Sequence, residues 1–160
     1  MEPMSLITNI LPTSNVFLDL DAGSKKRVFE QVGIVFENTH GTARSVIFDS
    51  LFAREKLGST GLGQGVAIPH GRIKGLKEAT GAFVRLSTPI QFDAPDAKPV
   101  SLIFVLLVPA NATDLHLQIL SELAQLFSDK ALREELLTLA EGSDVWQRIS
   151  TWEPYAADFS

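Results

Sequence analysis

The alternation of apolar and polar positions in the first part of the chain predicts a strand followed by a helix. Residues 15–21 (NVFLDLD) alternate between the two kinds of side chain, which is typical of a strand. Gly23 and Ser24 then supply a turn and a helix N-cap. The helix that follows is expected to end at Gly41 and to bury one stripe of apolar side chains, made of Val28, Val32, Val35 and Phe36.

A second helix is predicted directly after the first. Thr42 can cap it, and Gly58 supplies its stop. Its inner stripe contains Val46, Ile47, Ser50, Leu51 and Arg54. Arg54 is an unusual member of such a stripe, because a charged side chain is rarely placed on a buried helix face.

The second half of the chain predicts two strands and then more helices. Residues 81–88 and 100–108 are the strands, and the latter is apolar almost throughout, as expected for a central strand covered on both faces. Between them, residues 88–99 contain three prolines and are expected to form turns and sheet edge. Asp114 or Thr113 is expected to cap a helix whose buried stripe is Leu117, Leu120, Leu123, Ala124 and Phe127. Shorter helices are predicted over 131–140 and 145–151.

Strands interleaved with helices predict an α/β fold with a mixed β-sheet flanked by helices. The chain has 160 residues, of which 45% are hydrophobic, and this is enough for one domain with a sizeable core. We therefore expect a single domain over residues 1–160, with a core of about 5–151 and a short C-terminal tail at 152–160.

Composition narrows the possible classes of function. The chain has no cysteine, which excludes disulfides, thiol catalysis and cysteine-ligated zinc and fits a cytoplasmic protein. No secretory signal is visible, and the longest apolar run, 100–110, is too short to span a bilayer, so no membrane insertion is expected. The net charge is −5, and the basic residues are scattered. Lys25, Lys26 and Arg27 are expected to form a solvated face, and nucleic acid is not an expected partner.

The glycine-rich segment 58–72 (GSTGLGQGVAIPHGR) is the best candidate for chemistry. Its glycines allow the backbone to approach a ligand closely, and Pro69 should hold His70 on a stiff segment. The segment is neither a Walker A loop nor a Rossmann fingerprint, because it lacks the Gly-Lys-Ser/Thr element and has a helix before it and an extended segment after it. No Gly-x-Ser-x-Gly nucleophile elbow surrounds Ser59. No cofactor is predicted.

The three histidines, His40, His70 and His116, are too far apart to match a compact metal-binding signature, and no metal is predicted. His40 beside Gly41 is explained by a helix end, where a cation is favoured. His116 lies in the first turn of a predicted helix, where a structural and a functional role are equally open. The remaining possibility is a histidine nucleophile.

Attack by a neutral imidazole on phosphorus would give a phosphohistidine, and the incoming group would need a cation and hydrogen-bond donors. For His70 this function and that of an ordinary loop histidine both stay open. The available cation is Arg54, and the expected phosphate-binding loop consists of the Ser59 and Thr60 hydroxyls with the backbone at Gly61 and Gly71. Leu62 and Val66 are candidate rim contacts for a protein partner.

The chain resembles the IIA proteins of the bacterial phosphoenolpyruvate-dependent phosphotransferase system, in the fructose and mannitol group. The resemblance covers most of the chain and rests on Arg54-Glu55, on residues 58–70, on the apolar strand, and on Asp114-Leu115-His116-Leu117. It implies a mixed sheet flanked by helices. It also implies that His70 accepts a phosphoryl group from a small carrier of the HPr type, that His116 contacts that group, and that Arg54 neutralises its charge.

The chain contains no IIB or IIC segment, which makes the nitrogen-regulatory subfamily the preferred branch. There, the phosphorylation state controls binding to target proteins, whose identity the sequence does not give. Two alternatives are a transport component that passes phosphate to a separate IIB, and a binding module that has kept the fold and lost phosphorylation. Intact Arg54, His70 and His116 argue against the last of these.

Overall fold

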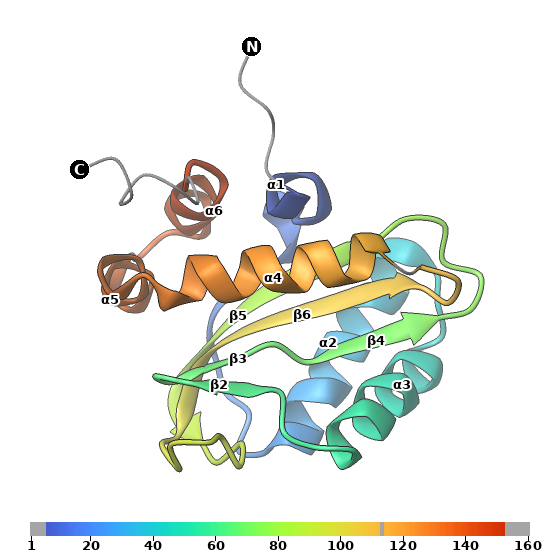
Figure 1. The fold of residues 1–160 in the computed structure, drawn as a ribbon, viewed down its shortest axis with the longest axis horizontal. Coiled ribbons are helices and arrows are strands. Elements are labelled where there is room, and N and C mark those ends of the chain that lie inside the picture. The colour runs from blue at the N-terminus through green and yellow to red at the C-terminus, as the bar shows by residue number, and fades with distance from the viewer. Residues whose placement is uncertain (1–5, 113, 153–160) are drawn as a thin grey trace.

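The computed structural model describes residues 6–112 and 114–152. It contains the mixed sheet that the sequence predicts, in the order β1-β5-β6-β3-β2, with β4 also paired to β6 (Figure 1). The strands are β1 (Val16–Leu20), β2 (Gly61–Gly63), β3 (Val66–Ala67), β4 (His70–Ile73), β5 (Thr80–Ile90) and β6 (Val100–Pro109). The helices are α1 (Leu6–Ile10), α2 (Lys25–His40), α3 (Arg44–Lys56), α4 (Asp114–Ser128), α5 (Lys130–Thr138) and α6 (Gly142–Ser150), with a short 3-10 helix, η1, at Thr13–Asn15.

Strand β6 is the centre of the fold, because it pairs antiparallel with β5 and parallel with both β3 and β4. Its side chains alternate between two cores, as the period of a strand requires. Leu102, Phe104, Leu106 and Val108 pack with α1, α4, α5 and α6, whereas Ile103, Val105 and Leu107 pack with α2 and α3. The prediction of a strand covered on both faces is therefore confirmed, and the domain has three layers (Figure 1).

The ends of α2 follow the predicted capping signals. The Ser24 hydroxyl accepts a hydrogen bond from the Arg27 backbone N–H at 3.2 Å, and Gly41 adopts the left-handed conformation with φ 75°. The predicted cap of α3 is wrong, because the N-cap position is Ala43 and not Thr42. The Glu37 carboxylate, from the last turns of α2, instead accepts the Arg44 backbone N–H at 3.0 Å.

The glycine-rich segment was predicted to be a loop, but it forms a β-hairpin followed by a strand. β2 and β3 pair antiparallel across Gln64 and Gly65, whose φ angles are 57° and 80°. Two successive positive φ angles are the geometry of a tight hairpin turn, which glycine adopts without strain. The Asp96 carboxylate supports the turn by accepting the Gln64 backbone N–H at 2.8 Å, and this hydrogen bond is the main reason that the pKa of Asp96 is lowered.

Four further expectations differ from the structure. The stripe of α4 is rotated, because Leu117 is 64% exposed and Ala124 is exposed, while Ile119 and Leu126 are buried. Val46 on α3 is also exposed. Residues 89–90, predicted to lie in the segment of turns and sheet edge, are the end of β5, where the pairing shifts before Ile90 meets Val100. Of the two proposed caps of α4, Asp114 is already helical, and Thr113 lies outside the described residues.

The C-terminal helices begin and end close to their predicted bounds. Trp152, at the start of the predicted tail, donates from Nε1 to the Asp129 carboxylate at 3.1 Å, and residues 153–160 lie outside the described part. No helix within 6–112 and 114–152 is both long enough and apolar enough to cross a membrane.

Candidate functional site

His70 is the first residue of β4 and is held by the strand pairing on either side of Pro69. The Pro69 carbonyl accepts the Leu106 backbone N–H at 2.9 Å, and His70 itself is in register with Leu106. The His70 Nδ1 lies 3.0 Å from the Ile68 carbonyl oxygen. A carbonyl oxygen only accepts, so Nδ1 carries the ring proton and Nε2 carries the lone pair.

Arg54 reaches that lone pair from the last turn of α3. Its Nε donates to the His70 Nε2 at 3.3 Å, and its Nη1 donates to the Gly58 carbonyl at 2.8 Å. The inner-stripe position predicted for Arg54 is thus explained. The side chain is half-buried because it crosses from the helix to the histidine.

His116 faces His70 from the first turn of α4. The ring centroids are 5.4 Å apart at an interplanar angle of 64°, which is an edge-on arrangement. His116 is only 8% exposed, yet neither of its ring nitrogens has a hydrogen-bond partner among the residues described. A buried imidazole without a partner is destabilising by about 1–3 kcal/mol. Its unpaired ring nitrogens leave one hydrogen-bond donor and one acceptor free beside His70.

The surroundings of both histidines favour the neutral form. Burial lowers the pKa of His70, and the positive charge of Arg54 adds to this, against the opposing effects of the Ile68 carbonyl and the Glu55 charge. Burial also lowers the pKa of His116, with further lowering by His70, Arg72 and Arg54. The lowered pKa values therefore favour the neutral form of both rings at pH 7.

Arg72 is part of this site, although the sequence did not single it out. It stands two residues after His70 in β4, and residues two apart in a strand share a face. Its Nη1 donates to the carbonyls of Ala110 and Ala112 at 3.2 and 2.7 Å. The i, i+2 spacing of His70 and Arg72 could have indicated that the two side chains share a face. This spacing is informative only when the segment is known to be a strand.

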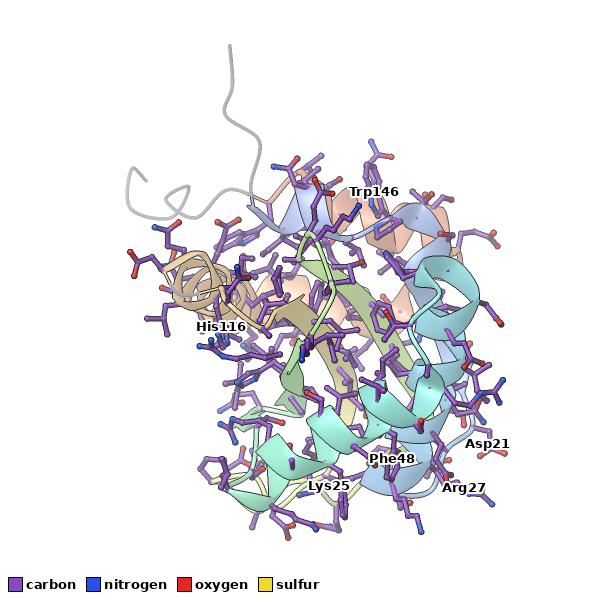
Figure 2. All side chains as sticks on the ribbon, turned by 90° about the vertical axis from the view of Figure 1, so that its right-hand side faces the viewer. Asp21, Lys25, Arg27, Phe48, His116 and Trp146 are labelled. Carbon is purple, nitrogen blue, oxygen red and sulfur yellow. The ribbon has the colours of Figure 1, made fainter. Side chains whose placement is uncertain are left out.

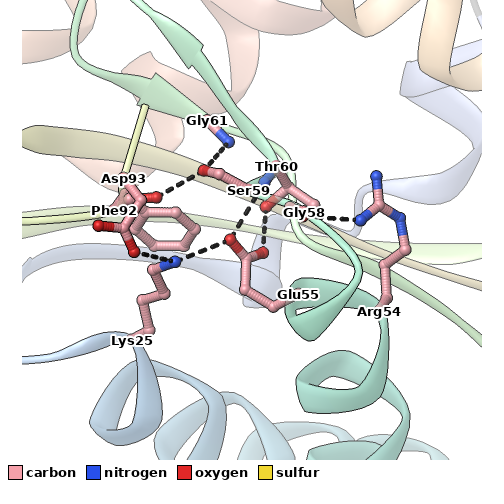
Figure 3. Close-up of polar contacts among 9 residues, drawn as sticks. All are labelled: Lys25, Arg54, Glu55, Gly58, Ser59, Thr60, Gly61, Phe92 and Asp93. Carbon is pink, nitrogen blue, oxygen red and sulfur yellow. Dashed lines mark hydrogen bonds and ion pairs between the residues drawn. The ribbon is translucent and has the colours of Figure 1, made fainter. Parts of the chain in front are cut away.

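A buried carboxylate holds the turn that precedes β2 (Figure 3). Glu55, 7% exposed, accepts the Thr60 backbone N–H at 3.1 Å, the Thr60 hydroxyl at 2.6 Å and the Lys25 ammonium at 3.0 Å. Lys25 also pairs with Asp93 at 3.0 Å. These contacts join the start of α2 to the end of α3 and to the turn that carries the Gly58 carbonyl bound by Arg54.

The four residues expected to bind phosphate are otherwise occupied in this structure. The Ser59 hydroxyl donates to the Phe92 carbonyl at 2.5 Å and accepts the Gly61 backbone N–H at 3.0 Å, and the Thr60 hydroxyl donates to Glu55 (Figure 3). Gly71 is buried within β4, and a Cβ there would collide with the Ser50 hydroxyl. Contact of Ser59 or Thr60 with phosphate would require these hydrogen bonds to be exchanged.

The remaining sequence candidates lie outside the histidine pair. His40 is exposed at the end of α2, where its Nδ1 is 2.7 Å from the Thr39 hydroxyl. Leu62 is 44% exposed, in keeping with a rim contact, but Val66 is 1% exposed and cannot be one. Across the described part of the chain, no three metal-ligating side chains come together.

Two histidines and two arginines thus gather where β4 meets α4 in a three-layer α/β domain, and the match to a family model defines the class of protein. The family model of the phosphoenolpyruvate-dependent sugar phosphotransferase system, EIIA 2, matches residues 9–152. The chain belongs to this family of IIA proteins, whose members are phosphotransfer components that act with phosphocarriers and other proteins of the system.

Individual relatives confirm the resemblance to nitrogen-regulatory IIA proteins. The chain is 39% identical over 147 residues to a nitrogen regulatory protein of Pseudomonas aeruginosa, covering 91% of this chain and 96% of that one. The crystal structure of the nitrogen regulatory protein IIA-Ntr from Neisseria meningitidis superposes with a TM-score of 0.86 at 57% identity, covering 91% and 99% of the two chains. A fructose-specific EIIA component of Haloferax volcanii is 35% identical over 132 residues, covering 82% and 86%.

Proposed function

We propose that the protein accepts a phosphoryl group from an HPr-type carrier on Nε2 of His70 and that its phosphorylation state regulates target proteins. The observation that carries this proposal is the contact between the His70 Nδ1 and the Ile68 carbonyl, because it leaves the lone pair on Nε2. A neutral ring in a fixed tautomer is the form of histidine that can attack phosphorus.

In the transfer step, the Nε2 lone pair forms a bond to phosphorus while the bond from phosphorus to the carrier's nitrogen breaks. The electron pair of that bond returns to the carrier's imidazole. The ring proton of His70 stays on Nδ1, hydrogen-bonded to the Ile68 carbonyl, so no proton needs to leave or enter the ring. The protein's contribution is to position the reacting atoms and to stabilise charge on the phosphoryl oxygens.

Arg54 and His116 are the groups that can stabilise that charge. Arg54 already bonds to Nε2, and its guanidinium can turn to an oxygen of the incoming group as the lone pair is used. His116 offers a ring N–H that has no partner among the described residues. The hydrogen bonds of Ser59, Thr60 and Gly61 shape the turn, and the buried backbone at Gly71 keeps β4 close to α3.

Regulation is the preferred role because the similarity to nitrogen-regulatory proteins extends over nearly the whole chain. A phosphoryl dianion beside two arginines changes the local charge with no need to refold the domain, so the effect would act through affinity for targets. We place this function in the cytoplasm, with no nucleic acid as a partner. The fructose-specific relative supports the alternative, transfer to a separate IIB.

The test is intact-mass analysis after incubation with phosphoenolpyruvate, enzyme I and the HPr-type carrier. The wild type should gain one acid-labile phosphoryl group, and His70→Ala should gain none. His116→Ala should still be phosphorylated, but about a hundredfold more slowly, since a donor to a charged oxygen is typically worth a few kcal/mol. An unmodified wild type in the presence of a charged carrier would contradict the proposal and favour a binding module.

The two branches are separated with the phosphorylated protein. Equal affinity of the phosphorylated and unphosphorylated forms for every captured target, together with rapid transfer to a IIB domain, would replace regulation by transport. Different affinities, with slow transfer to IIB, are the expected result.

A further inference from the structure

Two of the arginines, Arg54 and Arg72, lie beside the two histidines and have no carboxylate partner among the described residues. Most arginines in the described ranges pair with a carboxylate, namely Arg27, Arg44, Arg85 and Arg148. Within 6–112 and 114–152, Arg54, Arg72 and Arg133 have no carboxylate at ion-pair distance, and Arg54 and Arg72 are the two of these that lie beside the histidines. An unpaired guanidinium keeps its full charge available to its neighbours.

Arg72 is also a structural link between β4 and the connection that leads to α4. Its Nη1 donates to the Ala110 and Ala112 carbonyls, which lie just beyond the end of β6. The Ala110 backbone N–H donates in turn to the Ile73 carbonyl at 3.2 Å, next to Arg72 in the chain. The Ser50 hydroxyl fixes the other side by donating to the Arg72 carbonyl at 3.1 Å.

This link bears on His116 because α4 begins at Asp114, immediately after the tethered connection. The position of the first turn of α4 sets the separation of the two rings, and neither ring nitrogen of His116 is held by another described side chain. The Arg72 contacts therefore restrain the connection that leads to His116, together with the hydrogen bond from the Ala112 backbone N–H to the Pro109 carbonyl at 2.9 Å.

We propose that Arg72 is a positioning residue for His116, which fixes the β6–α4 connection and keeps a positive charge beside the ring so that it stays a neutral hydrogen-bond donor. The inference rests on the proposed function for the chemistry that His116 serves. It adds a residue to which no role has been given.

Electrostatics supports the same assignment. After burial, the charged and titratable groups that lower the pKa of His116 are His70 on β4, Arg72 on β4 and Arg54 on α3. On its own helix, Asp114 is the acidic residue of the first turn. Arg72 is not among the groups that shift the pKa of His70, so its effect is specific to one of the two rings.

The experiment uses Arg72→Gln, which keeps hydrogen-bond donors but removes the charge, and Arg72→Lys, which keeps the charge. The histidine ring nitrogens are titrated by NMR in the unphosphorylated full-length protein, and the rate of phosphorylation by the charged carrier is measured separately. Arg27→Gln is the control, because Arg27 is exposed on α2, on the opposite side of the molecule from His116 in Figure 2.

Arg72→Gln should raise the pKa of His116, leave the pKa of His70 nearly unchanged and slow phosphorylation about tenfold, less than the loss of a direct oxygen donor. Arg72→Lys should restore the titration of His116 and part of the rate. Arg27→Gln should match the wild type in both. An unchanged titration of His116 in a folded Arg72→Gln protein would overturn the proposal whatever the rate, whereas failure of the wild type to accept phosphate would overturn only the proposed function.

Discussion

The Nε of Arg54 donates to the Nε2 of His70 at 3.3 Å, so the arginine covers the nitrogen lone pair that the proposed transfer needs. The same guanidinium is anchored to the Gly58 carbonyl by a shorter bond of 2.8 Å. The weaker contact is the one that must be given up when phosphorus approaches. Arg54 therefore covers the Nε2 lone pair of the unphosphorylated ring and is placed to stabilise the negative charge of the incoming phosphoryl group.

This double role predicts opposite effects of Arg54→Met on two reactions of His70. Phosphorylation by the carrier should slow about a hundredfold, because a cation that faces the phosphoryl oxygens is lost. Carbethoxylation by diethyl pyrocarbonate at pH 8 should become faster, because the reagent is uncharged and the lone pair is uncovered. Peptide mass mapping of His70 measures the second rate.

Arg54→Lys is the informative control. A lysine keeps the charge but lacks the fork that reaches both Gly58 and His70, so it should recover part of the phosphorylation rate. If Arg54→Met slowed both reactions equally, the shielding role would be wrong and the residue would act on the fold alone.

The lowered pKa values of His70 and His116 predict how stability depends on pH. Unfolded histidine titrates near pH 6.5, and both folded values are lower. Between the folded and the unfolded pKa, the unfolded chain binds more protons, so the free energy of unfolding rises with pH there. Stability contributed by these neutral rings is fully present above about pH 6.5 and is lost as the pH falls through the folded pKa.

Urea unfolding at several pH values between 5 and 8 measures this slope. The double variant His70→Gln, His116→Gln should show a flatter profile over the same range, because it lacks the two rings whose pKa values are lowered. The carboxylates are the same in both proteins, so their contribution to the pH dependence of stability cancels in the comparison. An identical slope in the two would show that the rings titrate normally in the folded state.

Glu55→Gln is expected to destabilise the domain by about 2–3 kcal/mol, because it removes one charge of a buried pair and weakens three hydrogen bonds. Asp93→Asn is the matched variant, since Asp93 contacts the same Lys25 ammonium but its side chain is 83% exposed. Its effect should not exceed about 0.5 kcal/mol. Chemical denaturation compares the two, and similar losses would contradict the distinction drawn from burial.

Gly71→Ala should destabilise the contact between β4 and α3, because the added methyl group would meet the Ser50 Oγ and lie 3.2 Å from its Cβ. Overpacking of this kind typically costs about 1–3 kcal/mol. Ser50→Ala in the same chain should recover part of the loss by removing the hydroxyl. A double-mutant cycle of thermal unfolding tests the coupling, and strictly additive effects would refute it.

The elements predicted with most success are those with a strong periodic signal. The apolar run of β6, the Ser24 cap and the left-handed Gly41 all follow from local chemistry. The face of α4 was misjudged because leucines occur around much of that helix, and both possible stripes have helical spacing. Tertiary packing chose the one that contains Ile119 and Leu126 and left Leu117 exposed.

The hairpin at 61–67 was missed for a related reason. Glycines are poor strand formers in isolation, so the segment resembled a loop. It becomes a strand pair because β6 offers a partner for β3, and because Gly61 lies so near Ala94 that a Cβ there would be only 2.8 Å from the Ala94 Cβ. Neither fact is local to the segment.

For the candidate site, the sequence proposed His70, His116 and Arg54, and the structure places these three side chains close together. Arg72 was not found, because its relation to His116 depends on the parallel pairing of β4 with β6. The hydrogen bond from the Thr60 hydroxyl to Glu55 was not predicted either, because Thr60 was expected to bind phosphate.

The pairing of β6 with strands of both directions has a consequence for the order of folding. β5 and β6 are joined by a short connection and can zip together early, whereas β4 and β6 pair in parallel and must first close a longer loop. His70 is placed when β4 pairs with β6, which is expected to be the slower step. His116 lies on α4, which follows β6 in the chain. The two rings therefore come together only when the β4–β6 pair and α4 have both formed. A nascent or partly unfolded chain is not expected to accept a phosphoryl group.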